Sequence, residues 1–398
     1  MRVAVVTPRY GAEIAGGAET AARLLATRLA QRPGFTVTAL STCALDASSW
    51  ADHYPAGVST IDGVEVHRFP VTGRRTADFD ARTQVILGRG RRVTDAEQRA
   101  WLEQQGPVAP ALIDAIAHTD ADVVAFHPYL YHPTVAGITR VAERAVLHPA
   151  THDEPVLRLP MYEATFAAAR GLAYWSEPER VLTEHRFPIA AKPAVVVGLG
   201  VDVGPGDAAT ARTTAGLDDR PFLLCLGRVD DGKGAQLLAE CFARYKDRRP
   251  GPLQLVFAGP VVNTPPAHPD IVVLGAVDDP TKWGLLRGAH ALVSPSAFES
   301  FSIVLMEAWS VGTPALVNSR CPVTLDHVRR SGGGLAFGSY AELEVELDRL
   351  AGHGPDAGAL RAALGRAGQA YVDGRYRWSD VIDRYATFVE AAGARAGR

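Results

Sequence analysis

The 398-residue sequence has few cysteines, only three methionines and no long hydrophobic run. Its four cysteines are widely scattered, and no two of them have the spacing of metal ligands. A disulfide framework is unexpected in a chain of this size, and the cysteine pattern excludes the common zinc modules. The positions are Cys43, Cys225, Cys241 and Cys321.

The chain also lacks a strong charge of one sign. Its formal net charge is −3, so no overall basic field points to nucleic acid as a partner. No apolar stretch approaches the roughly 18 residues that suggest a membrane-spanning helix. The N-terminus has a short apolar run followed by a proline, which is typical of a first strand and not of a signal peptide. We therefore expect a cytoplasmic location.

The chain does contain a repeated alternation of short apolar runs and helical segments. Continuous runs rich in β-branched residues predict buried strands of a parallel sheet. A stretch at 204–216, rich in Gly, Ala and Thr, predicts a linker between two α/β halves. The expected strands are 2–7, 36–41, 64–70, 122–126, 145–147, 171–176 and 194–198 in the first half, and 222–226, 253–258, 271–274 and 315–317 in the second.

One segment of the second half, residues 292–318, carries two acids in an apolar strand–loop–helix–strand unit. Glu299 lies in the loop, and Glu307 lies within the helix expected at 302–311. The N-terminus of a helix attracts phosphate. Glu299, in the loop before the helix, could then reach a sugar beyond a bound phosphate, and Glu307, further along the helix, could accept hydrogen bonds from a ribose. Alternatively, Glu299 caps the helix and Glu307 is a buried acid with a structural partner.

A glycine-rich loop at 227–234 follows the first strand of the second half. It fits Gly-x4-Gly-Lys, the start of a triphosphatase P-loop, but Gly234 stands where that loop needs Ser or Thr for magnesium. Arg228 and Lys233, together with the helix expected at 235–245, would neutralise a diphosphate.

In the first half, polar residues follow the ends of the predicted strands. Gly16 and Gly17, between a strand and a helix, allow a phosphate to approach, or they form a plain tight turn. His127 follows the strand at 122–126, where ligands gather in open α/β sheets, or it is a loop histidine without a role. Tyr129, His152 and Asp153 have similar positions, and we expect them near an acceptor.

No metal site is expected. The histidines His127, His132 and His152, with Asp153, do not have the spacing of zinc ligands. Asp120 and Asp122 form an Asp-x-Asp pattern but precede a strand, whereas metal-binding acids of that kind follow one.

These motifs together resemble the retaining family-4 glycosyltransferases of the GT-B fold. The resemblance rests on Glu-x7-Glu after a Ser-Pro-Ser loop, on the following Gly-Thr-Pro, and on Gly-Arg-x4-Lys-Gly at 227–234. It implies two Rossmann-like domains whose parallel sheets face each other across a cleft. Residues 1–200 would bind the acceptor and 201–375 the nucleotide sugar, with a final helix at 376–398 packing on the first domain.

The resemblance also implies roles for individual residues. The catalytic residues would be Glu299, His127, Arg228 and Lys233. The donor-binding residues would be Gly16, Gly17, Arg228, Lys233, Gly259, Gly275, Ala276, Val277, Glu299, Phe301, Ser302, Ile303, Val304 and Glu307. The chain departs from the family at Ser300 and Ser302, where the family usually has glycine.

The implied function is transfer of a sugar from a nucleotide-diphosphate sugar, most commonly a UDP-sugar, with retention and without a metal or other cofactor. The acceptor could be a saccharide, a lipid or a small natural product. Two alternatives remain: a nucleotide-sugar epimerase of the same fold, and a protein that binds nucleotide sugars without catalysis. The basic run 89–92 could meet an acidic or lipid-phosphate acceptor at a membrane surface, or be a solvated surface. No pattern indicates an oligomeric state.

Overall fold

The computed structural model describes residues 1–14, 16–352 and 355–394. The chain forms two compact units, which we describe separately. Unit 1 comprises 1–199 and 379–398, and unit 2 comprises 200–378. The last part of the predicted C-terminal segment, 395–398, lies outside the described residues.

Unit 1 is built on an eight-stranded sheet with the order β3-β4-β2-β1-β5-β6-β7-β8. All neighbouring strands are parallel except β3 and β4, which form an antiparallel hairpin at the sheet edge. The strands are β1 Arg2–Val6, β2 Thr36–Thr42, β3 Gly57–Ile61, β4 Val64–Phe69, β5 Val123–Phe126, β6 Ala145–Leu147, β7 Gly171–Tyr174 and β8 Ala194–Val196. The parallel strands match the predicted ones to within about two residues at each end. Strand β3 was not predicted, because it is exposed along most of its length and has no apolar face.

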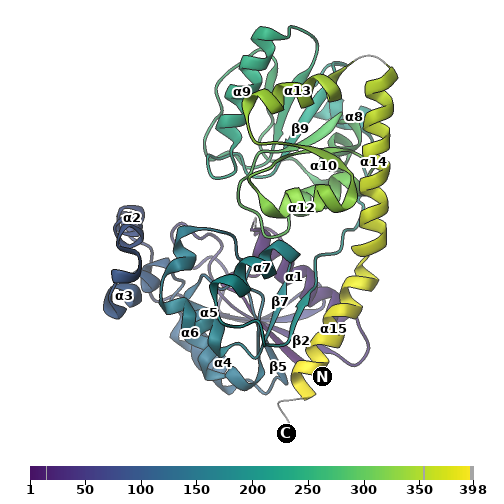
Figure 1. The fold of residues 1–398 in the computed structure, drawn as a ribbon. Helices are drawn as coiled ribbons and strands as arrows, with labels where there is room; N and C mark the ends of the chain where they lie inside the picture. The colour runs from purple at the N-terminus through teal and green to yellow at the C-terminus, as the bar shows by residue number, and fades with distance from the viewer. Residues whose placement is uncertain (15, 353–354, 395–398) are drawn as a thin grey trace. The chain divides into compact units, whose positions relative to one another are not determined.

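The helices of unit 1 pack around this sheet, while α2 and α3 extend away from it (Figure 1). They are α1 Gly17–Ala30, α2 Phe79–Arg89, α3 Asp95–Gln105, α4 Pro110–His118, α5 His132–Gly137, α6 Met161–Ala168, α7 Glu177–Arg186 and α15 Trp378–Ala394. Short 3-10 turns lie at Gly90–Arg92, Ile138–Arg140, Ala142–Arg144 and Pro155–Arg158.

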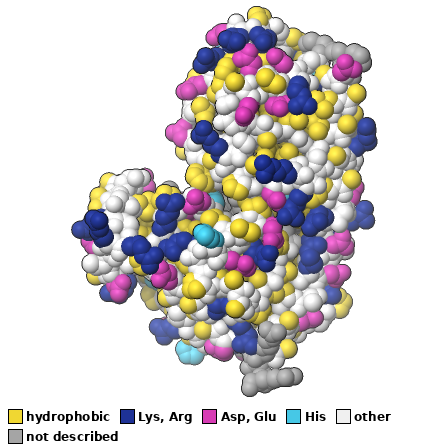
Figure 2. Space-filling model, in the orientation of Figure 1, with side chains coloured by type: hydrophobic (Ala, Val, Ile, Leu, Met, Phe, Trp, Pro, Cys, Tyr) yellow, Lys and Arg dark blue, Asp and Glu magenta, His cyan; other side chains and the backbone are white. Residues whose placement is uncertain are grey.

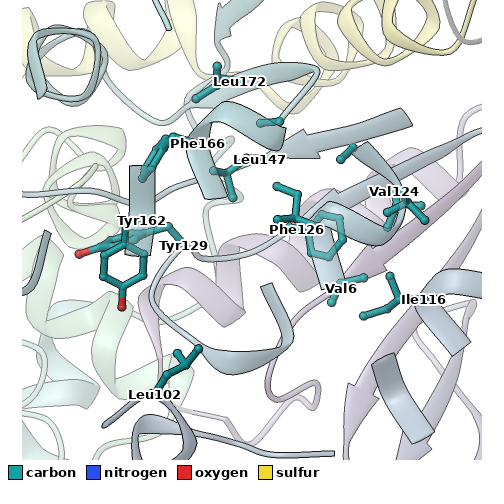
Figure 3. Close-up of a cluster of buried hydrophobic side chains, with 14 of the residues drawn as sticks. Val6, Leu102, Ile116, Val124, Phe126, Tyr129, Leu147, Tyr162, Phe166 and Leu172 are labelled. Carbon is teal, nitrogen blue, oxygen red and sulfur yellow. The ribbon is translucent and has the colours of Figure 1, made fainter. Parts of the chain in front are cut away.

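A continuous apolar core fills unit 1 between the sheet and helices α2 to α6. Figure 3 shows part of it, with Phe126 and Leu147 from neighbouring strands and Tyr129 beside Tyr162. The rings of Tyr129 and Tyr162 meet edge to face, with centroids 4.7 Å apart. The loop that follows β5 is therefore anchored in the core and not free at the surface.

Helix α15, the last in the chain, packs on unit 1. On this helix Tyr385 shares a hydrogen bond of 3.0 Å with His148, and Arg384 donates to the Val197 carbonyl at 2.9 Å. Tyr385, Ala386 and Val389 are buried on one helical face. The predicted return of the C-terminal helix to the first half of the chain is confirmed.

Unit 2 contains a six-stranded, fully parallel sheet with the order β11-β10-β9-β12-β13-β14. Its strands are β9 Phe222–Leu226, β10 Gln254–Ala258, β11 Ile271–Val273, β12 Ala291–Ser294, β13 Ala315–Asn318 and β14 Gly334–Phe337. Its helices are α8 Ala208–Thr214, α9 Ala235–Arg248, α10 Asp279–Gly288, α11 Ile303–Ser310, α12 Pro322–Ser331, α13 Tyr340–Ala351 and α14 Pro355–Arg375.

Two expectations about the chain as a whole can be compared with this fold. The stretch predicted as a linker, 204–216, contains helix α8 and lies within unit 2, which begins at Gly200. Asp207 caps α8 by accepting a hydrogen bond from the Thr210 N–H at 2.9 Å. Among the described residues, no helix combines the length and the apolar character needed to cross a bilayer.

Candidate active site

The central feature of unit 2 is an ion pair between Lys233 and Glu299, at the carboxyl ends of the neighbouring strands β9 and β12. Lys233 Nζ donates to Glu299 Oε1 at 2.7 Å. The loop that carries Lys233 is held by Asp230, whose Oδ1 accepts from the Lys233 N–H at 2.7 Å. Two residues that lie far apart in the sequence thus meet where ligands bind in open parallel sheets.

Arg228 lies in the same loop and pairs with Oδ2 of Asp230, the carboxylate oxygen that does not accept from the Lys233 N–H. Its side chain is 55% exposed, whereas that of Asp230 is 10% exposed. Asp230 therefore holds the side chain of Arg228 and the backbone of Lys233, the two cationic residues of the Gly-Arg-x4-Lys-Gly motif. The sequence analysis did not single out Asp230, because an acid beside two cations has no distinctive spacing.

Helix α11 begins beside Glu299 with an unusual residue at its N-cap. Ser302 has φ 69° and ψ 77°, the left-handed conformation that favours glycine. Serine normally caps a helix well, but the Ser302 side chain makes no capping hydrogen bond, and its buried Oγ has no partner among the described residues. Glycine would adopt this backbone conformation without strain, and the helix start has no side-chain cap.

Further along α11, Glu307 pairs with Lys282 of α10, with 2.9 Å between Nζ and Oε1. Burial raises the pKa of the Glu307 carboxyl, and the Lys282 ammonium partly offsets this rise. Burial disfavours the charged form of Lys282, but Glu307 and Asp279 outweigh it and raise its pKa. The buried-acid alternative is thus also compatible with the structure, since Glu307 has a partner. Lys282 was not predicted, because only the packing of α10 on α11 brings it close.

Glycines hold the ends of β9, β10 and β11 together. The Gly259 N–H donates to the Gly275 carbonyl at 2.7 Å. Gly259 has φ 141°, and a Cβ there would overlap the Gly227 carbonyl oxygen. Ala276 is exposed and Val277 half-buried in the loop that follows. Gly259 therefore has a structural reason for being glycine, whatever it contacts in a ligand.

The other predicted donor residues lie at the start of α11. Ile303 and Val304 are half-buried in its first turn. Phe301 is 4% exposed and packs edge to face against His327 and Tyr376, at centroid distances of 5.5 and 5.3 Å. Phe301 thus anchors the Glu299 loop in the core of unit 2, and any contact with a donor would involve its backbone.

In unit 1, Gly16 is the N-cap of α1 and Gly17 its first residue. A side chain at Gly16 would overlap the carboxylate of Glu19, which pairs with Arg9 through a 2.9 Å hydrogen bond from Nε. Nothing lies within 4 Å of the position a Cβ would take at Gly17. Gly16 thus makes room for the ion pair of Arg9 and Glu19, whereas the space beside Gly17 is open.

His127 follows β5 as predicted, but only 1% of its surface is exposed. Its ring stacks on His148 at a centroid distance of 3.9 Å, and Trp175 lies 5.2 Å from His148. Burial lowers the pKa of His127 to about 3, so the imidazole is neutral at physiological pH. These three rings follow the neighbouring strands β5, β6 and β7, and they form a stack that Tyr385 closes from α15.

The residues predicted near an acceptor divide into buried and exposed ones. Tyr129 is buried, and its hydroxyl donates to Glu154 Oε1 at 2.8 Å. His152 approaches the same oxygen, with 3.2 Å between its Nδ1 and Glu154 Oε1. Burial raises the pKa of Glu154, and His152 and Tyr129 oppose this rise. Asp153 is exposed and pairs with Arg158 at 3.0 Å.

The remaining charged motifs of unit 1 have partners at the surface. In the basic run 89–92, Arg89 pairs with Glu97 and Arg91 with Glu163. Asp120 pairs with Arg2, whose backbone N–H donates to Asp122 at 2.7 Å. Figure 2 shows basic and acidic side chains interspersed over the face that it draws. Within the part of the chain that the structure describes, no cluster of three or more His, Cys, Asp or Glu residues could hold a metal ion.

The described geometry can be compared with known proteins. The crystal structure of sucrose-phosphate synthase from Thermosynechococcus elongatus is similar, with a TM-score of 0.69, 16% identity and coverage of 99% of each chain. HepE from Anabaena, solved with UDP and glucose, has a TM-score of 0.67 and 15% identity, over 98% of this chain and 100% of the other. At these identities the likeness concerns the fold, which is GT-B, as the sequence analysis predicted.

The sequence comparisons concern mainly unit 2. Residues 220–351 match the family model described as glycosyl transferases group 1. A curated D-inositol 3-phosphate glycosyltransferase from Segniliparus rotundus is 30% identical over 219 residues, which are 50% of this chain and 46% of that protein. The chain spans about half the length of the curated relatives it matches. The resemblance seen in the sequence is thereby confirmed, whereas membership of family 4 stays a prediction.

Proposed function

We propose that the chain is a retaining glycosyltransferase that moves a hexosyl group from a nucleotide-diphosphate sugar, most simply a UDP-sugar, to a hydroxyl of an acceptor. The observation that carries this proposal is the pairing of Lys233 with Glu299 beside the uncapped start of α11. A cation, a sugar-binding carboxylate and a helix N-terminus are thus available at one place. The relatives' names support glycosyl transfer, and the UDP bound to HepE supports the donor class.

In this proposal the residues of unit 2 bind the donor. The diphosphate takes the N-terminus of α11, with Arg228 and Lys233 neutralising its charge. The Glu299 carboxylate accepts hydrogen bonds from hydroxyls of the donor sugar as its contact with Lys233 loosens. Glu307 accepts hydrogen bonds from the ribose. Charges that are already oriented stabilise the leaving diphosphate without reorganisation, which is often the largest catalytic contribution.

Retention calls for attack on the face from which the diphosphate leaves. The acceptor oxygen forms the new bond to the anomeric carbon as the bond to the diphosphate breaks, and a departing phosphate oxygen takes the acceptor's proton. This route needs no carboxylate nucleophile, unlike the double displacement of retaining glycosidases. Unit 1 would bind the acceptor near Tyr129, His152 and Asp153, and His127 would bond the donor sugar or support charge near the reacting carbon.

We include metal independence in the proposal, since the two cations and the helix start can supply the charge that a metal would bring. The absence of any other cofactor and the cytoplasmic location stay predictions.

A turnover assay with NMR detection tests the proposed function. The protein is incubated with UDP-sugars and a panel of acceptor alcohols, with and without EDTA, and the anomeric proton of the product is observed. We expect release of UDP that depends on an acceptor, a product with the donor's anomeric configuration, and no effect of EDTA. An inverted product, or a rate abolished by EDTA, would contradict the mechanism.

The same assay separates the two alternatives. An epimerase would convert the donor sugar when no acceptor is present. A protein that only binds nucleotide sugars would bind the donor and release no UDP with any acceptor. Either result would overturn the transferase assignment while leaving the donor site intact.

A further inference from the structure

Arg75 in unit 1 is a half-buried cation without a carboxylate partner. It lies in the segment between β4 and α2, and its Nη2 donates to the carbonyl and to the side-chain Oε1 of Gln105, at 3.2 and 3.0 Å. Its buried Nε has no hydrogen-bond partner among the described residues. Asp46 and Asp80 are close enough to act on it electrostatically, but neither forms an ion pair with it.

Burial lowers the pKa of Arg75, but a guanidinium remains charged at any physiological pH. A buried charge without an opposite charge is costly, so such groups are normally paired. The amide of Gln105 satisfies part of the hydrogen bonding and none of the charge. The Phe79 ring, whose centroid lies 4.1 Å from Cζ of Arg75, compensates part of the charge, and no ion pair among the described residues compensates the rest.

The neighbouring cation differs in this respect. Arg9 pairs with the buried Glu19, so these two residues together are neutral. The guanidinium groups of Arg9 and Arg75 lie 5.9 and 5.7 Å from the ring centroid of Trp50. Of these two cations beside the Trp50 ring, Arg75 is the one whose charge no ion pair within the described part of the chain neutralises.

A second hydrogen-bond donor lies against the same tryptophan. Tyr131 meets Trp50 edge to face at a centroid distance of 5.4 Å. Burial raises the pKa of Tyr131 to about 12, Glu19 adds to the rise, and Arg9 and Arg75 oppose it. The Tyr131 hydroxyl is therefore neutral, and both guanidinium groups lie within electrostatic range of it.

The fold explains why these groups converge. Arg75, Trp50, Arg9 and Tyr131 follow strands β4, β2, β1 and β5, which are consecutive neighbours in the sheet. All four residues lie on segments that leave the carboxyl ends of these strands, the edge at which open α/β sheets bind ligands. A planar guanidinium with unused N–H groups is suited to a carboxylate or a phosphate.

We propose that Arg75 and Tyr131 form a subsite for an anionic group, a carboxylate or a phosphate, carried by the acceptor. This inference rests on the proposed function, because only a transferase needs an acceptor. It narrows the acceptor from any hydroxyl compound to one with an acidic group. Neutral alcohols would leave the charge of Arg75 without an opposite charge.

The experiment titrates inorganic phosphate, and separately acetate, into the full chain saturated with UDP, at constant ionic strength, by calorimetry. UDP blocks the diphosphate site, so any further anion site is observed alone. The variants are Arg75→Gln, Arg75→Lys and Tyr131→Phe. The control is Arg74→Gln, which removes the same charge one residue away, at an exposed side chain without a hydrogen bond among the described residues.

We expect one anion to bind, with affinity at least about tenfold weaker in Arg75→Gln and nearly unchanged in Arg74→Gln, since a charge-assisted bond is lost only in the first. Arg75→Lys keeps the charge without the planar fork and should retain part of the binding, and it keeps the test valid if Arg75→Gln fails to fold. Whichever of phosphate and acetate binds identifies the acidic group.

Equal anion affinity in the wild type and in folded Arg75 variants, or no binding of either anion, would overturn the subsite. Failure of UDP to bind the wild type would instead contradict the proposed function. In that case the anion titration without UDP still decides the role of Arg75.

Discussion

At the scale of single residues, the ion pair of Lys233 with Glu299 is the contact on which the donor site depends. We expect Lys233→Ala to lower kcat by two to three orders of magnitude, or about 2.7–4 kcal/mol, the usual cost of removing a preoriented charge-stabilising donor. The control is Arg366→Ala on the exposed face of α14, which should leave kcat unchanged. Equal turnover by Lys233→Ala and the wild type would show that Lys233 does not stabilise the leaving diphosphate.

Glu307 has a different role, because it would bind the part of the donor that does not react. Glu307→Ala should weaken donor binding by about 1.5–3 kcal/mol, the range for hydrogen bonds to a charged group, with a smaller change in kcat. Glu240→Ala, an exposed acid on α9, is the matched control. Calorimetry with UDP measures the effect, and unchanged affinity would favour the interpretation of Glu307 as a structural partner of Lys282.

Ser302 is the residue at which the backbone and the side chain conflict. Its left-handed conformation costs a non-glycine residue roughly 1–2 kcal/mol, and its buried hydroxyl has no partner. Ser302→Gly removes both penalties and adds unfolded-chain entropy, so we expect a net stabilisation of up to about 1 kcal/mol. Ser302→Ala keeps the strained backbone and serves as the control. A Ser302→Gly protein less stable than Ser302→Ala in urea unfolding would contradict this account.

Individual site residues differed in how far the sequence could predict them. Glu299 and Glu307 were recognisable from their spacing within one strand–loop–helix unit, and Lys233 from its place in the Gly-Arg-x4-Lys-Gly loop after β9. Their partners were not: Asp230 is one acid in a charged loop and has no distinctive spacing, and Lys282 meets Glu307 only through the packing of α10 on α11. The burial of His127 was equally out of reach, since it depends on Trp175 and Tyr385 from distant parts of the chain.

At the scale of elements, two glycines in neighbouring loops of unit 2 make a matched comparison. Gly259 and Gly275 both have positive φ, but a side chain at Gly259 would overlap the Gly227 backbone, whereas Gly275 has open space. Gly275→Ala should cost about 1–2 kcal/mol of backbone strain. Gly259→Ala should cost clearly more, because the end of β9 or β10 must move. Urea unfolding measures both, and equal losses would contradict the close approach of these loops.

Most strands were predictable because parallel strands buried on both faces require continuous apolar runs. Strand β3 lacks that signal, since it forms the exposed edge of its sheet. Helix α8 was missed because its Gly, Ala and Thr content suggests a linker. The signal that could have revealed it was Asp207, three residues before Thr210, which is an N-cap pattern.

Three buried histidines predict acid sensitivity: His127 and His148, which follow strands of unit 1, and His327 within α12. Burial lowers the pKa of His127 and of His327 to about 3, and burial and the neighbouring His127 lower that of His148 well below its ordinary value. Because the folded pKa values lie below the unfolded value of about 6.5, the unfolded chain binds more protons. The stability these groups provide is complete above pH 6.5 and falls as the pH drops toward 3.

The expected slope is about 1.4 kcal/mol per pH unit for each histidine in that window. Urea unfolding between pH 5 and 8 measures it, and His148→Gln should show a shallower slope than the wild type. Identical slopes would mean that His148 is protonated in the folded chain.

At the scale of the whole molecule, the fold predicted from the sequence was correct because the same alternation of strands and helices occurs twice along the chain. The final helix was also predictable, since Ile382, Tyr385 and Val389 recur at helical spacing. The acceptor was not predictable from motifs, because the residues in the loops of unit 1 form no recognisable pattern. Only the tertiary contacts of Arg75 indicate its chemistry.

The measurement that tests the central claim most directly is a thermal-shift screen of the full chain against UDP, GDP, ADP, TDP and their common sugars, with and without EDTA. A ligand at a hundred times its Kd adds about 2.7 kcal/mol of stability, which is readily observed. We predict stabilisation by one diphosphate family, UDP foremost, that EDTA leaves unchanged and Lys233→Ala reduces. No shift with any diphosphate, or a shift only with magnesium and a triphosphate, would contradict the assignment of Arg228, Lys233, Glu299 and Glu307 to a nucleotide-sugar site.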